Sequence, residues 1–317
     1  ARRLWLQRDR RLSKQGRYFG RVRLTGGWRA QVFRACKHPA ELSHASQGEF
    51  TLDWWRRQLQ KPLRWFADMG ASCKDSHSAD VRRVQLTGTG AAALDVIVKR
   101  PRPRNGRRRV RMLLPPSRSR RAWKIGNALL HREVPTARPL ACVERRWGPL
   151  VLDNYLITEA VPDAADLCAF LRTAHAEYTP RAWVRLKRDL VRLLARRLRQ
   201  LHERGFVHLD CKGGNILVVT APELQLLWID LDGLRCVAHV PAARELAAIA
   251  RLHLSLTELP GLTRTDRVRF LRAYFTRFGS GPDAWRRHWT ALAERVAAQQ
   301  RSRAARQAWK LAHYGRT

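Results

Sequence analysis

One short segment limits the possible folds and functions of this chain more than any other. Residues 206–219 read FVHLDCKGGNILVV, and they gather His, Asp, Lys, two Gly and Asn between apolar stretches. A long amphipathic stretch precedes the segment, and the sequence LLWIDLDGLR follows it at residues 226–235. A surface turn would need only Gly, Asn and Asp. The His and the Lys therefore call for a chemical explanation.

The polar residues of this segment match the requirements of phosphoryl transfer from ATP. That reaction needs a carboxylate to orient the attacking hydroxyl, oxygen ligands for Mg²⁺ and a cation that positions the phosphates. Asp210 can supply the first, and Asn215 with Asp230 can supply the second, because carboxylate and amide oxygens are the ligands that Mg²⁺ prefers. Lys212 can reach the transferring phosphate, and two glycines, at 213 and 214, permit close approach of the backbone. The order is H-x-D-x-x-x-x-N followed by a strand that ends in Asp.

Each of these residues has a simpler explanation when it is taken alone. Asp210 can be a turn residue, Asn215 can close an Asx-turn, and Asp230 can end a strand. Their joint order, directly after a long amphipathic stretch, favours a phosphoryl-transfer site over three independent turn residues.

Hydrophobic periodicity divides the chain into a strand-rich part followed by a helix-rich part. Alternating segments joined by short turns predict an antiparallel sheet of about five strands with one helix. Apolar residues at spacings of three and four predict an amphipathic helix within residues 181–205, ended by Gly205. We therefore expect an α+β protein with a basic, Trp-rich N-terminal extension at 1–65, a strand-rich domain at 66–161 and a helical domain with the site at 162–317.

The individual elements follow from the same patterns. A helix with Thr51 as its N-cap is expected over residues 51–66, and a second helix over 117–133. Strands are expected at residues 26–35, 64–73, 80–86, 93–100, 138–146 and 150–161, and helices follow residue 241.

Composition adds an expectation about partners. The formal net charge is +36, from 62 Lys and Arg against 26 Asp and Glu. Such an excess indicates an anionic partner, either nucleic acid, an anionic membrane surface or a phosphorylated saccharide, although a genome-wide preference for Arg would give the same composition. No motif of interleaved aromatic and glycine residues accompanies the charge, so no specific nucleic acid is expected.

The sequence also gives an expectation about location. It contains no apolar run of about 18 residues that would predict a membrane-spanning helix, and its first residues lack the apolar core of a signal peptide. The six Cys form no C-x-x-C pair, which argues against a zinc ribbon or a thioredoxin-like site and fits a reducing cytosol. We therefore expect a cytoplasmic protein.

Several stretches together resemble a known family. They are VIVKR, RRAWKIGNALLHREVPTARPLACVERR, YLITEAV, HLDCKGGNILV, WIDLDGLR and LTRTDRVRFLRAYF, and they span about residues 66–278. On these residues the chain resembles the protein-kinase-like superfamily and, within it, the lipopolysaccharide kinases of the Kdo kinase and core heptose kinase type. The resemblance implies a bilobal fold, with an antiparallel sheet and one helix in the first lobe and mainly helices in the second. It also implies an enzyme that uses ATP and Mg²⁺.

The resemblance assigns roles to the residues of the motif. Asp210 matches the catalytic base, and Asn215 and Asp230 match the two metal-binding positions. Lys99, at the end of ALDVIVK, matches the strand lysine that pairs with the ATP phosphates; the alternative is an ordinary strand-end Lys in a basic stretch.

Further nucleotide contacts are implied by position. Glu159 and Val161 fall where the hinge between the lobes would bind adenine through its backbone. Ser76 and Ser78, in KDSHSA, fall where a loop would cover the phosphates, although an ordinary solvated hairpin explains this segment equally well. The sequence TGTG at residues 87–90 is expected to be only a turn, because it directly precedes the strand of Lys99.

Two positions depart from the protein-kinase pattern. No Glu or Asp occurs between Ser117 and Leu130, in the helix where kinases carry the Glu that pairs with the strand lysine. Leu209 follows His208 where protein kinases place the Arg that binds an activation-loop phosphate. The first departure weakens the nucleotide site or moves the partner of Lys99 elsewhere, and the second argues against control by activation-loop phosphorylation.

The expected acceptor is the lipopolysaccharide core or a similar anionic glycolipid, at a sugar hydroxyl of Kdo or heptose. An Arg-rich surface would favour this acceptor and the anionic inner-membrane surface that carries it. The resemblance therefore implies peripheral contact of a cytoplasmic protein with the inner membrane. The candidate contacts are the basic stretch at residues 100–111 and the Trp-bearing helix at 51–66, and for both a solvated basic face is the alternative. Two other functions remain open: an atypical protein kinase, and a catalytically weak pseudokinase that binds nucleotide.

Overall fold

The chain divides into two compact units, Ala1–Pro162 and Asp163–Thr317. The structure is a computed structural model, and it describes residues 5, 7–9, 14–34, 50–61, 63–67, 71–76, 79–86, 94–102, 113–276 and 283–314.

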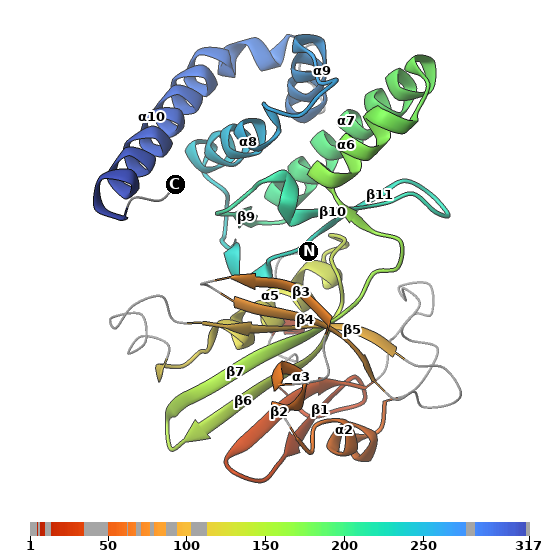
Figure 1. Cartoon of the computed structure of the whole chain (residues 1–317), viewed down its shortest axis with the longest axis vertical. Coiled ribbons are helices and arrows are strands. Elements are labelled where there is room, and N and C mark those ends of the chain that lie inside the picture. Colours follow the sequence, from red (N-terminus) through yellow and green to blue (C-terminus); the bar gives the residue numbers. More distant parts are fainter. Residues whose placement is uncertain are drawn as a thin grey trace. The chain divides into compact units, whose positions relative to one another are not determined.

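The first unit is built on a seven-stranded antiparallel sheet with the strand order β1-β2-β6-β7-β5-β4-β3 (Figure 1). Helices of this unit include α2 (Leu52–Gln58), α3 (Arg64–Ala67) and α5 (Arg118–His131). The strands are β1 (Phe19–Arg23), β2 (Trp28–Phe33), β3 (Ala71–Ser76), β4 (Ala79–Leu86), β5 (Leu94–Pro101), β6 (Pro139–Trp147) and β7 (Leu150–Glu159).

Two of these strands come from the basic N-terminal region. The strand expected at residues 26–35 is confirmed as β2, whereas β1 had no sequence prediction. Gly26 and Gly27 join them with φ of 64° and 78°, values that glycine adopts without steric cost. A Cβ on Gly27 would also lie 2.6 Å from the carbonyl oxygen of Arg146. The hairpin extends the sheet beyond β6 and raises its strand number above the five that the sequence predicts.

The segment before β3 corrects two predictions. The helix expected over residues 51–66 ends at Gln58, although Thr51 is its N-cap as predicted and accepts from the amide of Trp54 at 3.1 Å. The strand expected over 64–73 begins only at Ala71, after the short helix α3. Trp65 and Phe66 both contact Tyr155, with ring centroids 6.0 and 5.7 Å from it. Neighbouring residues of a strand point to opposite faces, so this shared contact requires a helical turn.

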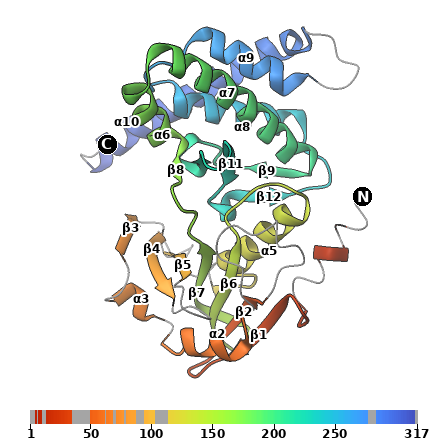
Figure 2. The ribbon, with the colours of Figure 1, turned by 90° about the vertical axis from the view of Figure 1, so that its right-hand side faces the viewer.

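The helix α5 packs against β6 and β7 (Figure 2). Ser117 caps its first turn by accepting from the amide of Arg120, and Trp123 is fully buried beneath it. The Ser119 hydroxyl donates to the buried Asn154 side chain on β7 at 2.7 Å. The helix predicted over residues 117–133 is therefore confirmed, and its register on the sheet is fixed by a buried hydrogen bond.

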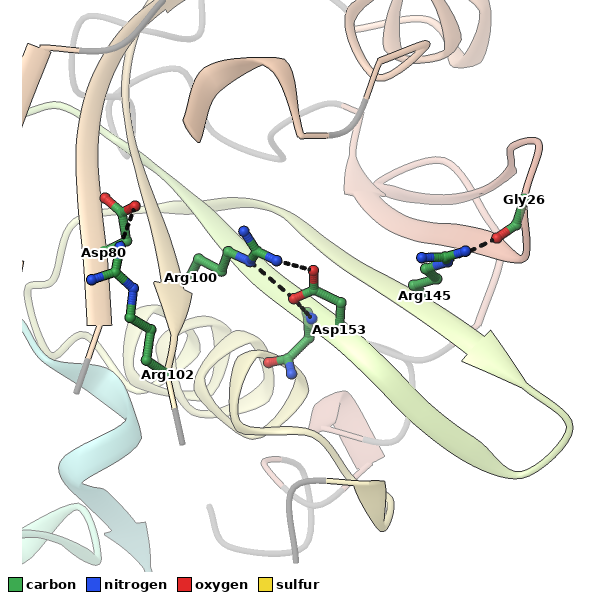
Figure 3. A network of polar contacts seen from close by, with 7 residues as sticks. Gly26, Asp80, Arg100, Arg102, Arg145 and Asp153 are labelled. Carbon is green, nitrogen blue, oxygen red and sulfur yellow. Dashed lines mark hydrogen bonds and ion pairs between the residues drawn. The ribbon is translucent and has the colours of Figure 1, made fainter. Parts of the chain in front are cut away.

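Arginine side chains neutralise carboxylates across the sheet (Figure 3). Arg100 makes a two-pronged contact with Asp153 on β7, at 3.1 and 2.6 Å. The buried carboxylate of Asp80 accepts from Arg82 at 2.8 Å and from Arg102 at 3.0 Å. Paired, hydrogen-bonded geometry of this kind offsets the cost of burying a carboxylate. Part of the basic stretch at 100–111 thus stabilises the sheet, while residues 103–112 lie outside the described part.

The second unit is mainly helical, with its short strands on one side of the helices (Figure 1). Its long helices are α6 (Leu167–Glu177), α7 (Pro180–Glu203), α8 (Ala242–Leu256), α9 (Arg264–Phe275) and α10 (Trp289–Tyr314). Helix α7 packs against α9, and α8 packs against α10. The short strands are β8 (Ala165–Asp166), β9 (Phe206–His208), β10 (Ile216–Val219), β11 (Gln225–Trp228) and β12 (Leu234–Cys236).

Helix α7 confirms the predicted amphipathic pattern. Leu190, Leu194 and Leu198 are buried, while Arg188 and Arg192 lie on the exposed face. Gly205 follows the helix with φ of 81° and stops it, as the sequence predicts. In the described part of the chain, no helix combines the length and the apolar character needed to cross a membrane.

A buried ion pair joins α7 to α9. The ammonium of Lys187 lies 2.8 Å from a carboxylate oxygen of Asp266 and donates to the carbonyl oxygen of Gly261 at 2.7 Å. Asp266 also caps the start of α9 through a reciprocal pair of bonds with Thr263. The stretch TRTDRVRFLRAY, part of the family resemblance, therefore has a structural role in helix packing.

Candidate active site

The candidate site is assembled from two loops that follow short strands of the second unit. Strand β9 pairs with β12, and β10 pairs with β11, both antiparallel. The loop after β9 carries Asp210 and Asn215, and the loop after β11 carries Asp230. The Leu209 amide donates to the Gly233 carbonyl at 2.9 Å, and the Ile229 amide donates to the Asn215 carbonyl at 3.0 Å. These two backbone bonds bring together the loops that the sequence identified.

His208 is fully buried and holds the first loop from within. Its Nδ1 accepts from the Asp210 amide at 3.2 Å, so the ring proton resides on Nε2, which donates to the Ile229 carbonyl at 3.1 Å. Burial lowers the pKa of His208 by more than the bond to Ile229 raises it. A neutral imidazole thus orients both loops, and it is a positioning group rather than an acid or a base.

Asp210, Lys212 and Asn215 form a small polar network at the surface of the loop. Lys212 Nζ lies 2.7 Å from Asp210 Oδ2, and Asn215 Nδ2 donates to the same oxygen at 3.2 Å and to the Asp210 carbonyl at 2.8 Å. Asn215 is buried, whereas the Asp210 side chain is 51% exposed. The hydrogen bond from the buried Asn215 amide therefore fixes the position of the solvent-accessible Asp210 carboxylate.

The electrostatics of the network keep Asp210 ionised. Desolvation raises the pKa of this carboxyl, but the hydrogen bond and charge of Lys212, with the bond from Asn215, lower it by more. The net shift is downward, so Asp210 is a carboxylate near neutral pH. Lys212 and Asn215 both contact Oδ2, and Oδ1 is the oxygen that can accept a hydrogen bond from a substrate hydroxyl.

Asp230 adopts an unusual backbone conformation. Its φ and ψ of 59° and 51° lie in the left-handed region, where few residues other than glycine occur. Its carboxylate lies 3.7 Å from the point that a Cβ on Gly233 would occupy, and the same point is 3.1 Å from the His208 ring. The left-handed turn and the absence of a side chain at Gly233 together give room for the Asp230 carboxylate beside His208.

The two glycines of the loop differ in their roles. A Cβ on Gly213 would lie 2.5 Å from Cys168 Sγ and 2.9 Å from a methyl group of Leu256, whereas a Cβ on Gly214 would meet nothing within 4 Å. The Gly213 amide also donates to the Ser255 hydroxyl of α8 at 2.9 Å. Gly213 is therefore required by packing against α6 and α8. Ser255 and Cys168 were not identified from the sequence, because 42 and 45 positions separate them from Gly213.

The remaining predicted residues lie in the first unit. Lys99 is on β5 opposite Leu156 of β7, so both side chains occupy the same face of the sheet. Asn154, which contacts α5, lies two positions before Leu156 on β7, and alternation along the strand places it on this face as well. Within the described part of α5 there is no acidic residue, and the departure noted in the sequence stands. The buried Glu144 on β6 is instead paired with Arg146 at 2.9 Å and Arg120 at 3.6 Å.

The other predicted nucleotide contacts are placed in part. Glu159 ends β7, and its amide donates to the Arg138 carbonyl at 2.9 Å. No backbone hydrogen bond links Val161 to another described residue. Ser76 ends β3 opposite Ala79, which gives a hairpin to β4, while Ser78 lies outside the described residues. Residues 87–93, which include TGTG, also lie outside them, between β4 and β5.

The fold defines a protein of the protein-kinase-like class: an α+β chain with an antiparallel sheet unit and a helical unit that carries Asp210, Asn215 and Asp230 on two joined loops. The chain belongs to the lipopolysaccharide kinase (Kdo/WaaP) family, whose model matches residues 97–274.

Individual relatives agree with this membership. The chain is 31% identical over 169 residues to the lipopolysaccharide core heptose(I) kinase WaaP of Pseudomonas aeruginosa, a match that covers 52% of this chain and 62% of that protein. It is 28% identical over 163 residues to the Escherichia coli protein of the same name, covering 49% and 59%. The match thus spans less than two thirds of the length of either relative.

A solved structure shows the same fold. The chain is similar to the solved structure of WaaP in complex with acyl carrier protein, with a TM-score of 0.55 and 23% sequence identity. The match covers 78% of this chain and 94% of that one. The protein-kinase-like fold expected from the sequence is therefore confirmed.

Proposed function

We propose that this chain is an ATP-dependent phosphotransferase that places a phosphate on a sugar hydroxyl of the lipopolysaccharide inner core, at Kdo or heptose. The observation that carries the proposal is the joining of the Asp210 loop and the Asp230 loop by two backbone hydrogen bonds. Family membership and the two heptose kinase relatives support the choice of acceptor. The proposed acceptor side is the helical region at 162–317, and the proposed nucleotide side is the sheet region at 66–161, with 1–65 as an N-terminal addition.

In this proposal Asp210 is the catalytic base. Its Oδ1 accepts the hydrogen bond of the acceptor hydroxyl and takes the proton as the hydroxyl oxygen bonds to the γ-phosphorus. The bond from the γ-phosphorus to the β–γ bridging oxygen breaks, and ADP leaves with that oxygen. Lys212, held on Oδ2, is close enough to shift onto the transferring phosphate and neutralise its developing charge. The depressed pKa of Asp210 keeps the base ionised before the reaction begins.

Asn215 and Asp230 are proposed to hold Mg²⁺. Because Asn215 Nδ2 makes both bonds to Asp210, its amide oxygen remains as the ligand atom, and Asp230 contributes a carboxylate from the adjacent loop. One or two protein oxygens plus substrate phosphates are a common set of Mg²⁺ ligands, so these residues fit the ion. When bound, Mg²⁺ would neutralise the β- and γ-phosphate oxygens.

The proposed nucleotide-binding residues lie in the first unit. Lys99 would pair with the phosphates, the Glu159 carbonyl and the Val161 backbone would bind adenine, and Ser76 with Ser78 would cover the phosphates. The Val161 backbone is compatible with this role, because it makes no backbone hydrogen bond within the described part. Helix α5 contains no acidic residue, so the acid that pairs with the strand lysine in protein kinases does not come from this helix.

The test is Mg²⁺-dependent ATP consumption, with and without a lipid-extractable saccharide fraction from the host. Asp210→Asn should lower the saccharide-stimulated rate by about 10²- to 10⁴-fold, while Asp189→Asn, at an exposed position of α7, should leave it unchanged. An unchanged rate in Asp210→Asn would refute the base assignment. Bound nucleotide without turnover in the wild type would instead support the pseudokinase, and phosphorylated Ser or Thr would support the atypical protein kinase.

We further propose that the helical unit binds acyl carrier protein. A protein of similar fold was solved in complex with that carrier, and this unit contains an apolar cavity of about 330 Å³. The cavity lies among α6 to α10, with Leu171, Leu190, Leu194, Leu252 and Leu292 in its lining, and its size is in the range of small-ligand sites. An acyl chain is the occupant that suits such a lining.

Binding of acylated and unacylated acyl carrier protein by size-exclusion chromatography tests this second proposal. The acylated form should bind more tightly to the wild type, and Ala297→Phe, which fills part of the cavity, should abolish the difference. Equal binding of both carrier forms by the wild type would count against an acyl-chain site.

A further inference from the structure

A second cavity of the helical unit is lined by arginines. It measures about 470 Å³ and lies between α8, α10 and the end of β9. Arg244 and Arg251 come from α8, seven positions apart and hence on one face of the helix, and Arg295 comes from α10. Two helices thus direct three guanidinium groups at one concave surface.

Among the described residues, no carboxylate neutralises the charge of this cavity. None of its described lining residues is acidic, and none of the three arginines forms an ion pair with a described residue. Arg295 donates to the Ala243 carbonyl at 3.3 Å, which anchors its side chain at the first turn of α8. Elsewhere in the unit Lys187, Lys212 and Arg269 each contact a carboxylate. Three unneutralised guanidinium groups around a cavity attract an anion more strongly than the same charges spread over a convex surface.

The cavity adjoins the Asp210 loop. Leu209 lines it and immediately precedes Asp210. Arg251 also lies near Cys211, which follows Asp210 in the loop. Burial raises the pKa of the Cys211 thiol to about 12, and the positive charge of Arg251 opposes that rise. A group bound at the arginines would therefore lie against the loop that holds the proposed base.

We propose that Arg244, Arg251 and Arg295 form an anion subsite that binds a phosphate or carboxylate group carried by the acceptor saccharide. The identity of the ligand as an acceptor saccharide rests on the proposed function. The binding of an anion rests on the cavity and its arginines alone. Guanidinium groups bind both anions through two parallel hydrogen bonds, which also fixes the orientation of the ligand. The three arginines are positioning residues, since they would hold a part of the acceptor that does not react.

A contact of equal strength in the ground state and the transition state contributes uniform binding, so its removal raises KM and leaves kcat unchanged. The double variant Arg244→Gln/Arg251→Gln should therefore raise the acceptor KM by roughly 10-fold or more, with kcat and the KM for ATP within about 2-fold of the wild type. Arg188→Gln/Arg192→Gln, which removes the same charge from the exposed face of α7, is the matched control and should change neither constant. Arg251→Lys should retain part of the affinity, because it keeps the charge and loses the paired geometry.

A binding measurement separates this inference from the proposed function. Equilibrium dialysis with radiolabelled inorganic phosphate, in the presence of a saturating non-hydrolysable ATP analogue, should show binding to the wild type and to the α7 control but not to the Arg244→Gln/Arg251→Gln variant. This result would uphold the subsite even if no saccharide were phosphorylated. Equal phosphate binding by all three proteins would overturn it.

The source of the anion is resolved with modified acceptors. If the subsite holds a phosphate, phosphatase treatment of the acceptor should raise its KM to that of the double variant, and if it holds a carboxylate, reduction of the carboxyl group should do so. Either result supports the subsite. An unchanged acceptor KM in the double variant, with loss of binding to acyl carrier protein, would overturn the inference and assign the arginines to an acidic protein partner.

Discussion

At the scale of single residues, Asp230 combines a proposed ligand role with a strained backbone. A left-handed conformation costs roughly 1–2 kcal/mol for most residues, but Asn and Asp tolerate it because their side chains bond locally. Asp230→Asn should therefore keep the free energy of unfolding, while Asp230→Ala should lose about 1 kcal/mol of it. Both should lower Mg²⁺-dependent turnover by roughly 100-fold or more, because an Mg²⁺ ligand supplies several kcal/mol of charge stabilisation. Urea unfolding and steady-state kinetics measure the two effects.

Asp163 provides the control, since it is also left-handed, with φ of 50°, and lies outside both loops. Asp163→Ala should lose similar stability and keep its turnover. Full turnover in Asp230→Asn would show that this carboxylate is not a metal ligand.

Residues of the site were predictable where their signal is local in the sequence. Asp210, Lys212 and Asn215 lie within six consecutive residues, and the structure places them in one hydrogen-bonded network. The sequence alone could not identify Ser255, which holds the Gly213 amide from a helix 42 positions away. A hydroxyl on an amphipathic helix has no pattern that distinguishes it from other surface serines, so only the folded chain reveals its partner.

At the scale of elements, the packing of the Asp210 loop against α6 and α8 depends on Gly213. Gly213→Ala would place a methyl group 2.5 Å from Cys168 Sγ, and such overpacking costs about 1–3 kcal/mol. Gly214→Ala has open space around its methyl group and should change the free energy of unfolding by less than about 0.5 kcal/mol. Chemical unfolding of both variants tests the difference. If the contact with Cys168 is the cause, adding Cys168→Ala to Gly213→Ala should restore part of the loss, and a purely additive double variant would contradict it.

The joint between α7 and α9 should make the stability of the helical unit depend on pH. Desolvation raises the pKa of Asp266, but the bonds from Lys187 and Thr263 lower it by more, so its folded pKa is depressed. A depressed carboxyl pKa contributes stability above the unfolded value of about 3.9, and that contribution is lost as the pH falls through the folded pKa. Lys187→Met should cost about 3 kcal/mol at neutral pH, because it leaves a buried carboxylate short of a partner.

The stability difference between wild type and Lys187→Met should therefore narrow as the pH falls below about 4. Urea unfolding at neutral and acid pH measures it, and Arg188→Met, at the next, exposed position of α7, is the control. A difference that stays constant with pH would show that Lys187 acts through its packing on Trp183 instead, where its ammonium lies 5.6 Å from the ring centroid.

Elements with a strong, regular period were predictable from the sequence, and those shaped by distant contacts were not. Helix α7 has an apolar stripe over its whole length, and its extent was predicted to within a few residues. The short helix α3 falls where the predicted helix over 51–66 and the predicted strand over 64–73 overlap, and its contacts with Tyr155, about 90 positions later, have no local sequence signal. Strand β1 was missed, since its pairing with β2 depends on two left-handed glycines rather than on a clear alternation.

At the scale of the whole molecule, the net charge of +36 leads to a prediction about membranes. Each basic residue near an anionic surface contributes about 1 kcal/mol of attraction, and that attraction is screened as the Debye length falls from about 10 Å at 0.1 M salt to 3 Å at 1 M. The chain should therefore sediment with phosphatidylglycerol vesicles at low salt and lose at least about 10-fold of its affinity at 1 M salt.

Vesicles of phosphatidylcholine alone are the control, and they should bind little of the protein at either salt concentration, because this lipid carries no net charge that would attract basic side chains. Equal binding to both vesicle types would point to apolar insertion rather than charge. Absence of binding to either vesicle type would refute the predicted membrane contact. The excess of arginine would then be explained by genome composition. The three arginines of the α8–α10 cavity would stand apart from that result, because their proposed ligand is a single anionic group and their test is phosphate binding in solution.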